Sequence, residues 1–299
     1  MAFGRLGIIG GSGLGAALSG LARESNAKAE LRQVETPFGD PSGPITLTEL
    51  DGVPVALLSR HGPGHLYNPS RVPYRANLFA LKQVGVTHVL ASAAAGSLRE
   101  EIAPGDLVVC DQVIDRTFRR ASTFFDELAV HVELGQPFCS TLRGLLLASA
   151  PEVEARVHAA GTYICMEGPQ LSTRAESEWH RAMGAHLIGM TLMPEAKLAR
   201  EAELCYAAVA LPTDYDCWRP APNDVPGMAL LGEIARNLSN ATERALALIR
   251  AAAPKIAQGA AGHCHCQEAL TLGIWSDRAR IPDELRNRLS LLLARPLAA

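Results

Sequence analysis

RLGIIGGSGLG, residues 5–15, is the stretch from which the fold of this chain can be worked out. A short apolar run ends in the turn GGSG, residues 10–13, which is typical of a buried strand whose carboxyl end meets a ligand. Glycine allows a phosphate to approach the backbone closely, and the Ser12 hydroxyl is a further donor. A plain tight turn fits the pattern equally well. A dinucleotide fingerprint does not, because the third glycine comes one residue early, at Gly15.

Outward from this stretch, strands and helices alternate along the chain. The hydrophobic pattern and the turn signals predict strands at residues 45–50, 53–58, 88–92, 107–114, 163–166, 187–190 and 205–211, and helices at 72–85, 141–149, 173–183, 195–202 and 225–253. Such alternation predicts an α/β fold with a mixed, largely covered sheet. No linker interrupts it, so we expect one domain over residues 1–255. An appendage over residues 256–299 would end in a helix near 281–295.

Composition excludes several classes of protein. With 299 residues, 48% of them hydrophobic, and a net charge of −3, the chain is neither disordered nor generally attractive to nucleic acid or anionic membranes. No apolar run is long enough to span a bilayer and the N-terminus lacks a signal pattern, so we expect a cytoplasmic protein. Five of the seven cysteines are scattered among apolar neighbours, which predicts reduced core thiols.

Arg60 and two histidines follow the predicted strand 53–58. The planar guanidinium of Arg60 at a strand end is well placed to meet an oxyanion. His61 and His65 could bind a metal, but no third ligand lies nearby in the sequence, so we expect none. A solvated loop is the plainer interpretation.

Small residues and a hydroxyl follow two other predicted strands. The run AAAGS, residues 93–97, would allow a sugar or phosphate to approach, although close packing of a strand on a helix explains it equally well. Thr191 follows the strand 187–190 and could donate to phosphate. Met190 could cover an apolar ribose face, or simply belong to the core.

Asp214 and Asp216 leave the predicted strand 205–211 beside two aromatic residues. Carboxylates in this position can accept hydrogen bonds from an exocyclic amine, and a protonated one can donate to a ring nitrogen. An Asp-rich turn or a helix cap would have the same spacing.

The sequence HCHC, residues 263–266, is the one local cysteine pattern. It could supply half of a zinc site, but no second pair follows it. C-x-C could also close a small disulfide, or have no role. We therefore expect no metal.

Taken together, these segments resemble the trimeric purine nucleoside phosphorylase family, and most closely its methylthioadenosine phosphorylase branch. The resemblance runs from about Gly7 to Pro254. Its most specific stretches are GGSGLG (10–15), RHG (60–62), NPSRVPYRANLFALK (68–82), GSLREEIAPGDLVVCDQVIDRT (96–117), MEGPQLSTRAES (166–177), GMTLMPEAKLARE (189–201) and TDYDCW (213–218). It implies a three-layer α/β fold around a distorted, partly closed mixed sheet. It also implies a homotrimer, possibly a hexamer, with active sites shared at the interfaces.

The resemblance assigns roles residue by residue. The phosphate site would comprise Ser12, Arg60, His61, Ala94 (through its backbone N–H) and Thr191. The ribose and the 5′ group would be met by Met190, His65, Gly227, Leu230 and, from a neighbouring subunit, His131. The base would be met by Asp214, Asp216, Leu171 and Ser172, with Asp214 as the catalytic acid. Inorganic phosphate would be a co-substrate, and no metal or organic cofactor is implied.

The implied substrate is a 5′-modified adenosine, above all 5′-methylthioadenosine. Relatives that act on 6-oxopurines resemble one another in having Asn at the position of Asp214, and a carboxylate here favours the 6-amino group. Other departures from the family pattern are Ala93, Gln170, Leu171, Gly189 and Gly227. Four alternatives therefore stay open: a 5′-halo-5′-deoxyadenosine phosphorylase, a methylthioinosine or 6-oxopurine phosphorylase, a nucleosidase that uses water, and a non-catalytic nucleoside binder.

Overall fold

The computed structural model describes residues 3–14, 17, 29–219, 227–259 and 264–298, and for residues 227–231 the backbone only. Gly15 and His263 of the motifs above lie outside these ranges. The strands are β1 (Arg5–Gly10), β2 (Glu30–Arg32), β3 (Ile45–Leu50), β4 (Val53–Ser59), β5 (Val86–Ser97), β6 (Leu107–Val109), β7 (Gln112–Arg116), β8 (Val157–His158), β9 (Thr162–Met166), β10 (Leu187–Gly189) and β11 (Cys205–Asp214). The helices are α2 (Tyr74–Gln83), α3 (Ser140–Ser149), α4 (Arg174–Ala182), α5 (Leu192–Glu201), α6 (Gly227–Gly259), α7 (Asp283–Arg288) and α8 (Ser290–Ala298).

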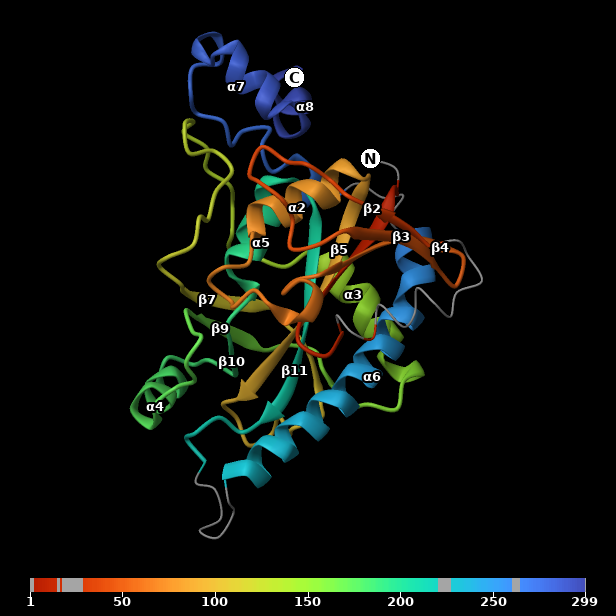
Figure 1. The fold of residues 1–299 in the computed structure, drawn as a ribbon, viewed down its shortest axis with the longest axis vertical. Helices are drawn as coiled ribbons and strands as arrows, with labels where there is room; N and C mark the ends of the chain where they lie inside the picture. Colours follow the sequence, from red (N-terminus) through yellow and green to blue (C-terminus); the bar gives the residue numbers. More distant parts are fainter. Residues whose placement is uncertain (1–2, 15–16, 18–28, 220–226, 260–263, 299) are drawn as a thin grey trace.

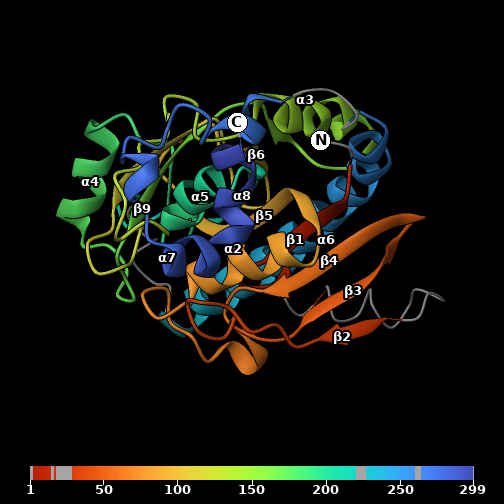
Figure 2. The ribbon, with the colours of Figure 1, turned by 90° about the horizontal axis from the view of Figure 1, so that it is seen from above.

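The described strands form one mixed sheet in three layers with the helices, as expected. Alternate residues of β1 point to opposite faces: Ile9 packs in a core cluster with residues of α2, α5 and α7, whereas Leu6 and Ile8 pack in a second cluster with residues of α3 and α6. Figure 1 shows α6 running along one side of the sheet, and Figure 2 shows α2, α5 and α8 gathered on another. No described helix combines the length and apolar character needed to cross a membrane.

The sheet divides along β5. β11 pairs in parallel with one edge of β5 over its length, from His88 to Gly96. On the other edge β1 pairs in parallel as far as Ala91, and β10 pairs antiparallel only at Gly96 and Ser97. Residues 92–95 therefore have no strand partner on that edge among the described residues. This gap interrupts the regular pairing of the sheet, and it corresponds to the distorted sheet that the resemblance implies.

Two of the predicted strands differ substantially from the structure, and β2 and β8 were not predicted. The run 93–97 belongs to β5 rather than following it, because β11 and β10 continue the pairing. The predicted strand 107–114 is two strands, β6 and β7, since β6 pairs with β11 and β8 whereas β7 pairs with β9. The chain crosses between the two halves of the sheet at residues 110–111.

The C-terminal region packs on the body. α6 continues to Gly259, past the boundary expected at residue 256. The single helix predicted near 281–295 is two helices, α7 and α8, and Ile281, Leu285 and Leu293 belong to the same core cluster as α2 and α5. Both helices lie together at one end of the molecule (Figure 1).

Candidate active site

The gap along β5 opens into a cavity of about 380 Å³. It is lined by Gly11, Ser12, Arg60, His61, His65, Pro69, Ala93, Ala94, Ala95, Gly96, Met166, Pro169, Leu171, Ser172, Ile188, Gly189, Met190, Thr191, Thr213, Asp214, Asp216 and Ile234. Most of these residues stand at the ends of β1, β4, β10 and β11 or in the gap of β5. The division of the sheet therefore brings strand ends that are far apart in the sequence to one place.

Eleven of the fourteen residues to which the resemblance assigned a role line this cavity. They are Ser12, Arg60, His61, His65, Ala94, Leu171, Ser172, Met190, Thr191, Asp214 and Asp216. His131 does not. Its exposed ring packs edge-on against Trp275 with centroids 4.6 Å apart, beside the C-terminal segment. Gly227 begins α6, and the side chain of Leu230 lies outside the described residues.

Arg60 is fully buried and paired with Glu195. Nε and Nη2 donate to the two carboxylate oxygens at 2.7 Å each, and Nη1 donates to the Ser92 carbonyl at 2.7 Å. Burial opposes the charge, but the carboxylate outweighs it and raises the pKa of Arg60 above its usual value. Two of the five guanidinium N–H donors remain for an anion. The fork expected to face phosphate directly is thus held by Glu195, which the sequence analysis missed.

Gly11 makes room for this arginine. A Cβ atom at Gly11 would lie 2.6 Å from Nη1 of Arg60 and 2.9 Å from the Ser92 carbonyl oxygen. The Gly11 N–H is directed to the Ser92 hydroxyl at 3.4 Å. A glycine at position 11 is therefore required by the approach of a buried cation.

His61 is neutral near pH 7. Burial and the neighbouring Arg60 lower the pKa of His61 to about 4. Its Nδ1 lies 2.7 Å from the Tyr67 carbonyl oxygen, which can only accept, so Nδ1 carries the proton and Nε2 is an acceptor. The His61 ring stacks on His65 with centroids 4.1 Å apart.

Thr191 precedes α5 with its side chain buried and uninvolved in capping, so the hydroxyl is available to the cavity. Gly189, two residues before Thr191, is required by Tyr163. A Cβ atom at position 189 would lie 1.9 Å from the Tyr163 hydroxyl oxygen. The ring of Tyr163 thus fills the space that the polar residue of the family pattern would take, which accounts for that departure.

The two aspartates stand where β11 leaves the sheet. Asp214 pairs with Gly96, and the Thr213 hydroxyl donates to Asp214 Oδ1 at 2.7 Å. Burial, together with the charge of Asp216, raises the pKa of Asp214 despite that hydrogen bond. Asp216 Oδ2 is buried and accepts no hydrogen bond from the described part of the chain. Such an oxygen is costly unless a ligand donates to it.

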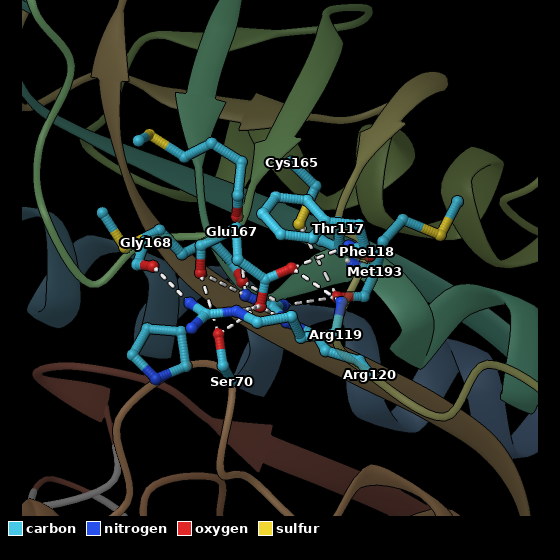
Figure 3. A network of polar contacts seen from close by, with 12 residues as sticks. Ser70, Thr117, Phe118, Arg119, Arg120, Cys165, Glu167, Gly168 and Met193 are labelled. Atoms are coloured by element: carbon cyan, nitrogen blue, oxygen red, sulfur yellow. Dashed lines mark hydrogen bonds and ion pairs between the residues drawn. The ribbon is translucent and has the colours of Figure 1, made fainter.

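A buried ion network holds the methionine side of the cavity in place (Figure 3). Glu167 accepts from Ser70, from the backbone N–H groups of Phe118 and Arg119, and from Arg120. These bonds outweigh burial and lower the pKa of Glu167 to about 2. Nη1 of Arg120 in turn donates to the Met190 carbonyl at 2.5 Å.

The sequence patterns did not predict Arg120 or Glu167, although Glu167 lies in the motif at residues 166–177 and Arg120 closely follows the motif at residues 96–117. Neither touches the cavity; Arg120 positions Met190 and Met193 through their carbonyl oxygens, and Glu167 holds Arg120. A buried arginine next to a cavity segment has no local signature, because its acceptors, most of them backbone carbonyl oxygens, lie 46 to 73 positions away.

Comparison with known proteins places this geometry in a family. The Phosphorylase superfamily matches residues 5–254. The S-methyl-5′-thioadenosine phosphorylase of Geobacter sulfurreducens is 46% identical over 292 residues, which cover 96% of this chain and 97% of that protein. The protein of the same name from Cereibacter sphaeroides is 51% identical over 237 residues, 79% of this chain and 80% of that one.

Solved structures agree. A methylthioadenosine phosphorylase from an antarctic soil metagenomic library has a TM-score of 0.85 and 41% identity, covering 98% of this chain and 99% of that one. The methylthioadenosine phosphorylase of Schistosoma mansoni in complex with tubercidin has a TM-score of 0.75 and 33% identity, covering 97% and 98%. The family expected from the sequence motifs is confirmed: the chain belongs to the phosphorylase superfamily, among the relatives named methylthioadenosine phosphorylases.

Proposed function

We propose that this chain cleaves 5′-methylthioadenosine with inorganic phosphate, giving adenine and 5-methylthioribose 1-phosphate. One observation carries the proposal: a single cavity joins a buried arginine and hydroxyl donors at one end to a pair of partly buried carboxyl groups at the other. The first set suits an anion and the second suits a base with N–H donors and acceptors. The names of the relatives support the same reaction.

At the phosphate end, the remaining N–H donors of Arg60 and the hydroxyls of Ser12 and Thr191 would bind HPO₄²⁻, together with the Ala94 backbone N–H. Because His61 presents Nε2 as an acceptor, it would receive the phosphate hydroxyl. The pair Arg60–Glu195 is neutral as a whole, so directed hydrogen bonds rather than a free cation would hold the anion.

At the base end, a protonated Asp214 would donate to N7 of adenine. The unpartnered Oδ2 of Asp216 would accept from the 6-amino group, which a 6-oxopurine lacks. Ser172 and Leu171 would flank the base, and Met190 would lie against the ribose. His65 and the start of α6, with Gly227 and Leu230, would meet the 5′ group.

The reaction would then proceed by dissociation of the glycosidic bond. As C1′–N9 breaks, its electron pair stays on N9, the proton of Asp214 moves to N7, and a phosphate oxygen bonds to C1′. The phosphate anion next to C1′ stabilises the oxocarbenium-like transition state. The proton of the phosphate hydroxyl is released on ester formation and replaces the one that Asp214 gave. Phosphate is thus the co-substrate, and this balance requires neither a metal nor an organic cofactor at the cavity.

We further propose a cytoplasmic homotrimer, in which His131 of each subunit reaches a neighbour's 5′ pocket. The position of His131 supports this, since its exposed ring lies outside the cavity of its own chain. Light scattering gives the mass, and His131→Ala should raise KM for methylthioadenosine more than for adenosine. A monomer with full activity would contradict the shared site.

The decisive assay measures release of the free base with and without phosphate: adenine from 5′-methylthioadenosine and 5′-chloro-5′-deoxyadenosine, and hypoxanthine from 5′-methylthioinosine. We expect fast release only with the methylthioadenosine and only with phosphate. Release without phosphate would indicate a nucleosidase, preference for the chloro compound a different 5′ group, and binding without release a non-catalytic protein. Each of these results would overturn the proposal.

Asp214→Asn tests the acid. We expect kcat to fall by about 10²–10⁴-fold, since a general acid contributes that much, with phosphate affinity unchanged. Asp51→Asn is the matched control: Asp51 stands in the β3–β4 turn with φ of 50°, which asparagine also adopts, and should keep full activity. Unchanged turnover in Asp214→Asn would exclude this residue as the acid.

A further inference from the structure

Four cysteines that are far apart in the sequence meet beside β11. Their sulfur atoms all lie within 4.8 Å of one another: Cys139, Cys205, Cys264 and Cys266. Cys139 immediately precedes α3, Cys205 begins β11, and the other two belong to the segment after α6. The C-x-C motif thus has a second pair of thiols, which comes from upstream rather than from the residues that follow it.

Backbone hydrogen bonds hold the four thiols in place. The Cys139 N–H donates to the carbonyl of Tyr206 at 2.7 Å, which fixes the start of α3 next to the start of β11. The Gln267 N–H donates to the Cys264 carbonyl at 2.9 Å and closes the turn that carries the C-x-C pair. The arrangement therefore follows from the fold of three separate segments.

The spacing of the sulfur atoms fits one metal ion. A tetrahedral zinc site with Zn–S bonds of about 2.3 Å has sulfur atoms about 3.8 Å apart. Cys139 Sγ and Cys264 Sγ are 3.6 Å apart, and no other pair exceeds 4.8 Å. Two disulfides would instead separate the four sulfurs into two bonded pairs of about 2.05 Å each.

The surroundings fit a structural site that is largely buried, with Cys264 alone of the four cysteines partly exposed. Cys139, Cys205 and Cys266 are at most 4% exposed and pack among the apolar residues between the sheet, α3 and α6. The N–H of Leu142, in the first turn of α3, is directed to Cys139 Sγ at 3.5 Å. A helix N-terminus and an N–H donor both stabilise a thiolate. Four thiolate ligands and no open position are typical of structural zinc.

We propose that Cys139, Cys205, Cys264 and Cys266 bind one Zn²⁺ ion, which ties the segment after α6 to β11 and to the start of α3. On binding, the four thiols release four protons and become thiolates, so no oxidant or reductant takes part. The metal would join residues up to 127 positions apart, Cys139 and Cys266, and none of the four ligands lines the cavity. The inference goes beyond the proposed phosphorolysis and does not depend on it.

Metal analysis of the full chain tests the proposal directly. The protein is purified under reducing conditions without chelators, and its metal content is measured by mass spectrometry before and after reconstitution with Zn²⁺. We expect one zinc per chain. Replacement by Co²⁺ should produce thiolate-to-cobalt charge transfer and the intense ligand-field bands of tetrahedral cobalt. After the zinc is displaced, a thiol reagent should react with four more cysteines than it does in the zinc-loaded protein.

Variants give the matched comparison. The double variant Cys264→Ser/Cys266→Ser should bind no zinc. A chelator should lower the Tm of the wild type but leave the Tm of this variant unchanged. Cys110→Ser alters a buried thiol outside the cluster and should keep one zinc per chain. The wild-type measurements stand even if a variant fails to fold. Reduced wild-type protein that takes up neither Zn²⁺ nor Co²⁺, or native protein whose mass is four hydrogen atoms short because of two disulfides, would overturn the proposal.

Discussion

Removing the negative charge of Glu195 should lower the stability of the protein and at the same time strengthen its binding of phosphate. In Glu195→Gln, the amide oxygen can still accept from Nη2 of Arg60 and from the Tyr206 hydroxyl, which donates to Glu195 Oε1 at 2.7 Å. The new NH₂ group, however, faces the N–H of Arg60 Nε, so that hydrogen bond is lost. The buried guanidinium then has no counter-charge.

The magnitude follows from the burial of both partners. The side chains of Arg60 and Glu195 are both 0% exposed, so solvent cannot compensate for the missing charge. Breaking a buried ion pair on one side costs about 3–5 kcal/mol, which corresponds to a fall in Tm of roughly 5–8 °C for a chain of this length. Phosphate, by contrast, would meet an arginine whose charge is no longer neutralised. We expect phosphate to raise the Tm of the variant more than that of the wild type.

Thermal unfolding at fixed protein concentration, with and without phosphate, is the assay. Tyr206→Phe is the control, since it removes one hydrogen bond to the carboxylate, worth about 1.5–3 kcal/mol, and leaves the ion pair intact. If Glu195→Gln is no less stable than Tyr206→Phe, and phosphate protects it no better than the wild type, the reasoning about the buried pair is refuted.

Three further changes probe the rest of the site. The pKa of His61 is about 4 in the folded protein and 6.5 in the unfolded chain, so its contribution of up to about 3 kcal/mol to the free energy of unfolding is complete above pH 6.5 and is lost as the pH falls toward 4. The Tm of His61→Asn should therefore fall less steeply with decreasing pH than the Tm of the wild type, and parallel curves of Tm against pH would contradict this. Gly189→Ala should cost about 1–3 kcal/mol in urea unfolding, since its Cβ overlaps Tyr163; an unchanged midpoint would disprove that overlap. Arg120→Lys should raise the KM for nucleoside with a smaller effect on kcat, because it frees the Met190 backbone; equal effects would argue for a different role.

The sequence by itself predicted most of the strands and helices, and it indicated several of the strand ends that line the cavity. Apolar runs that end in glycine, arginine or aspartate are local signals, since a strand needs only its own alternation and its own turn residues. The pattern therefore located Ser12, Arg60, Thr191 and Asp214, and the order of the motifs identified the family.

Only the tertiary structure decided which partner each of these groups has. The pairing of Arg60 with Glu195 spans 135 positions. The gap of β5 exists because β1 pairs with β5 only as far as Ala91, whereas β10 pairs with it only at Gly96 and Ser97. Likewise the C-x-C motif meets its other two thiols through the packing of α3 on β11. The partners of buried charges and thiols depend on which strands and helices pack next to one another, and no single segment of the chain contains that information.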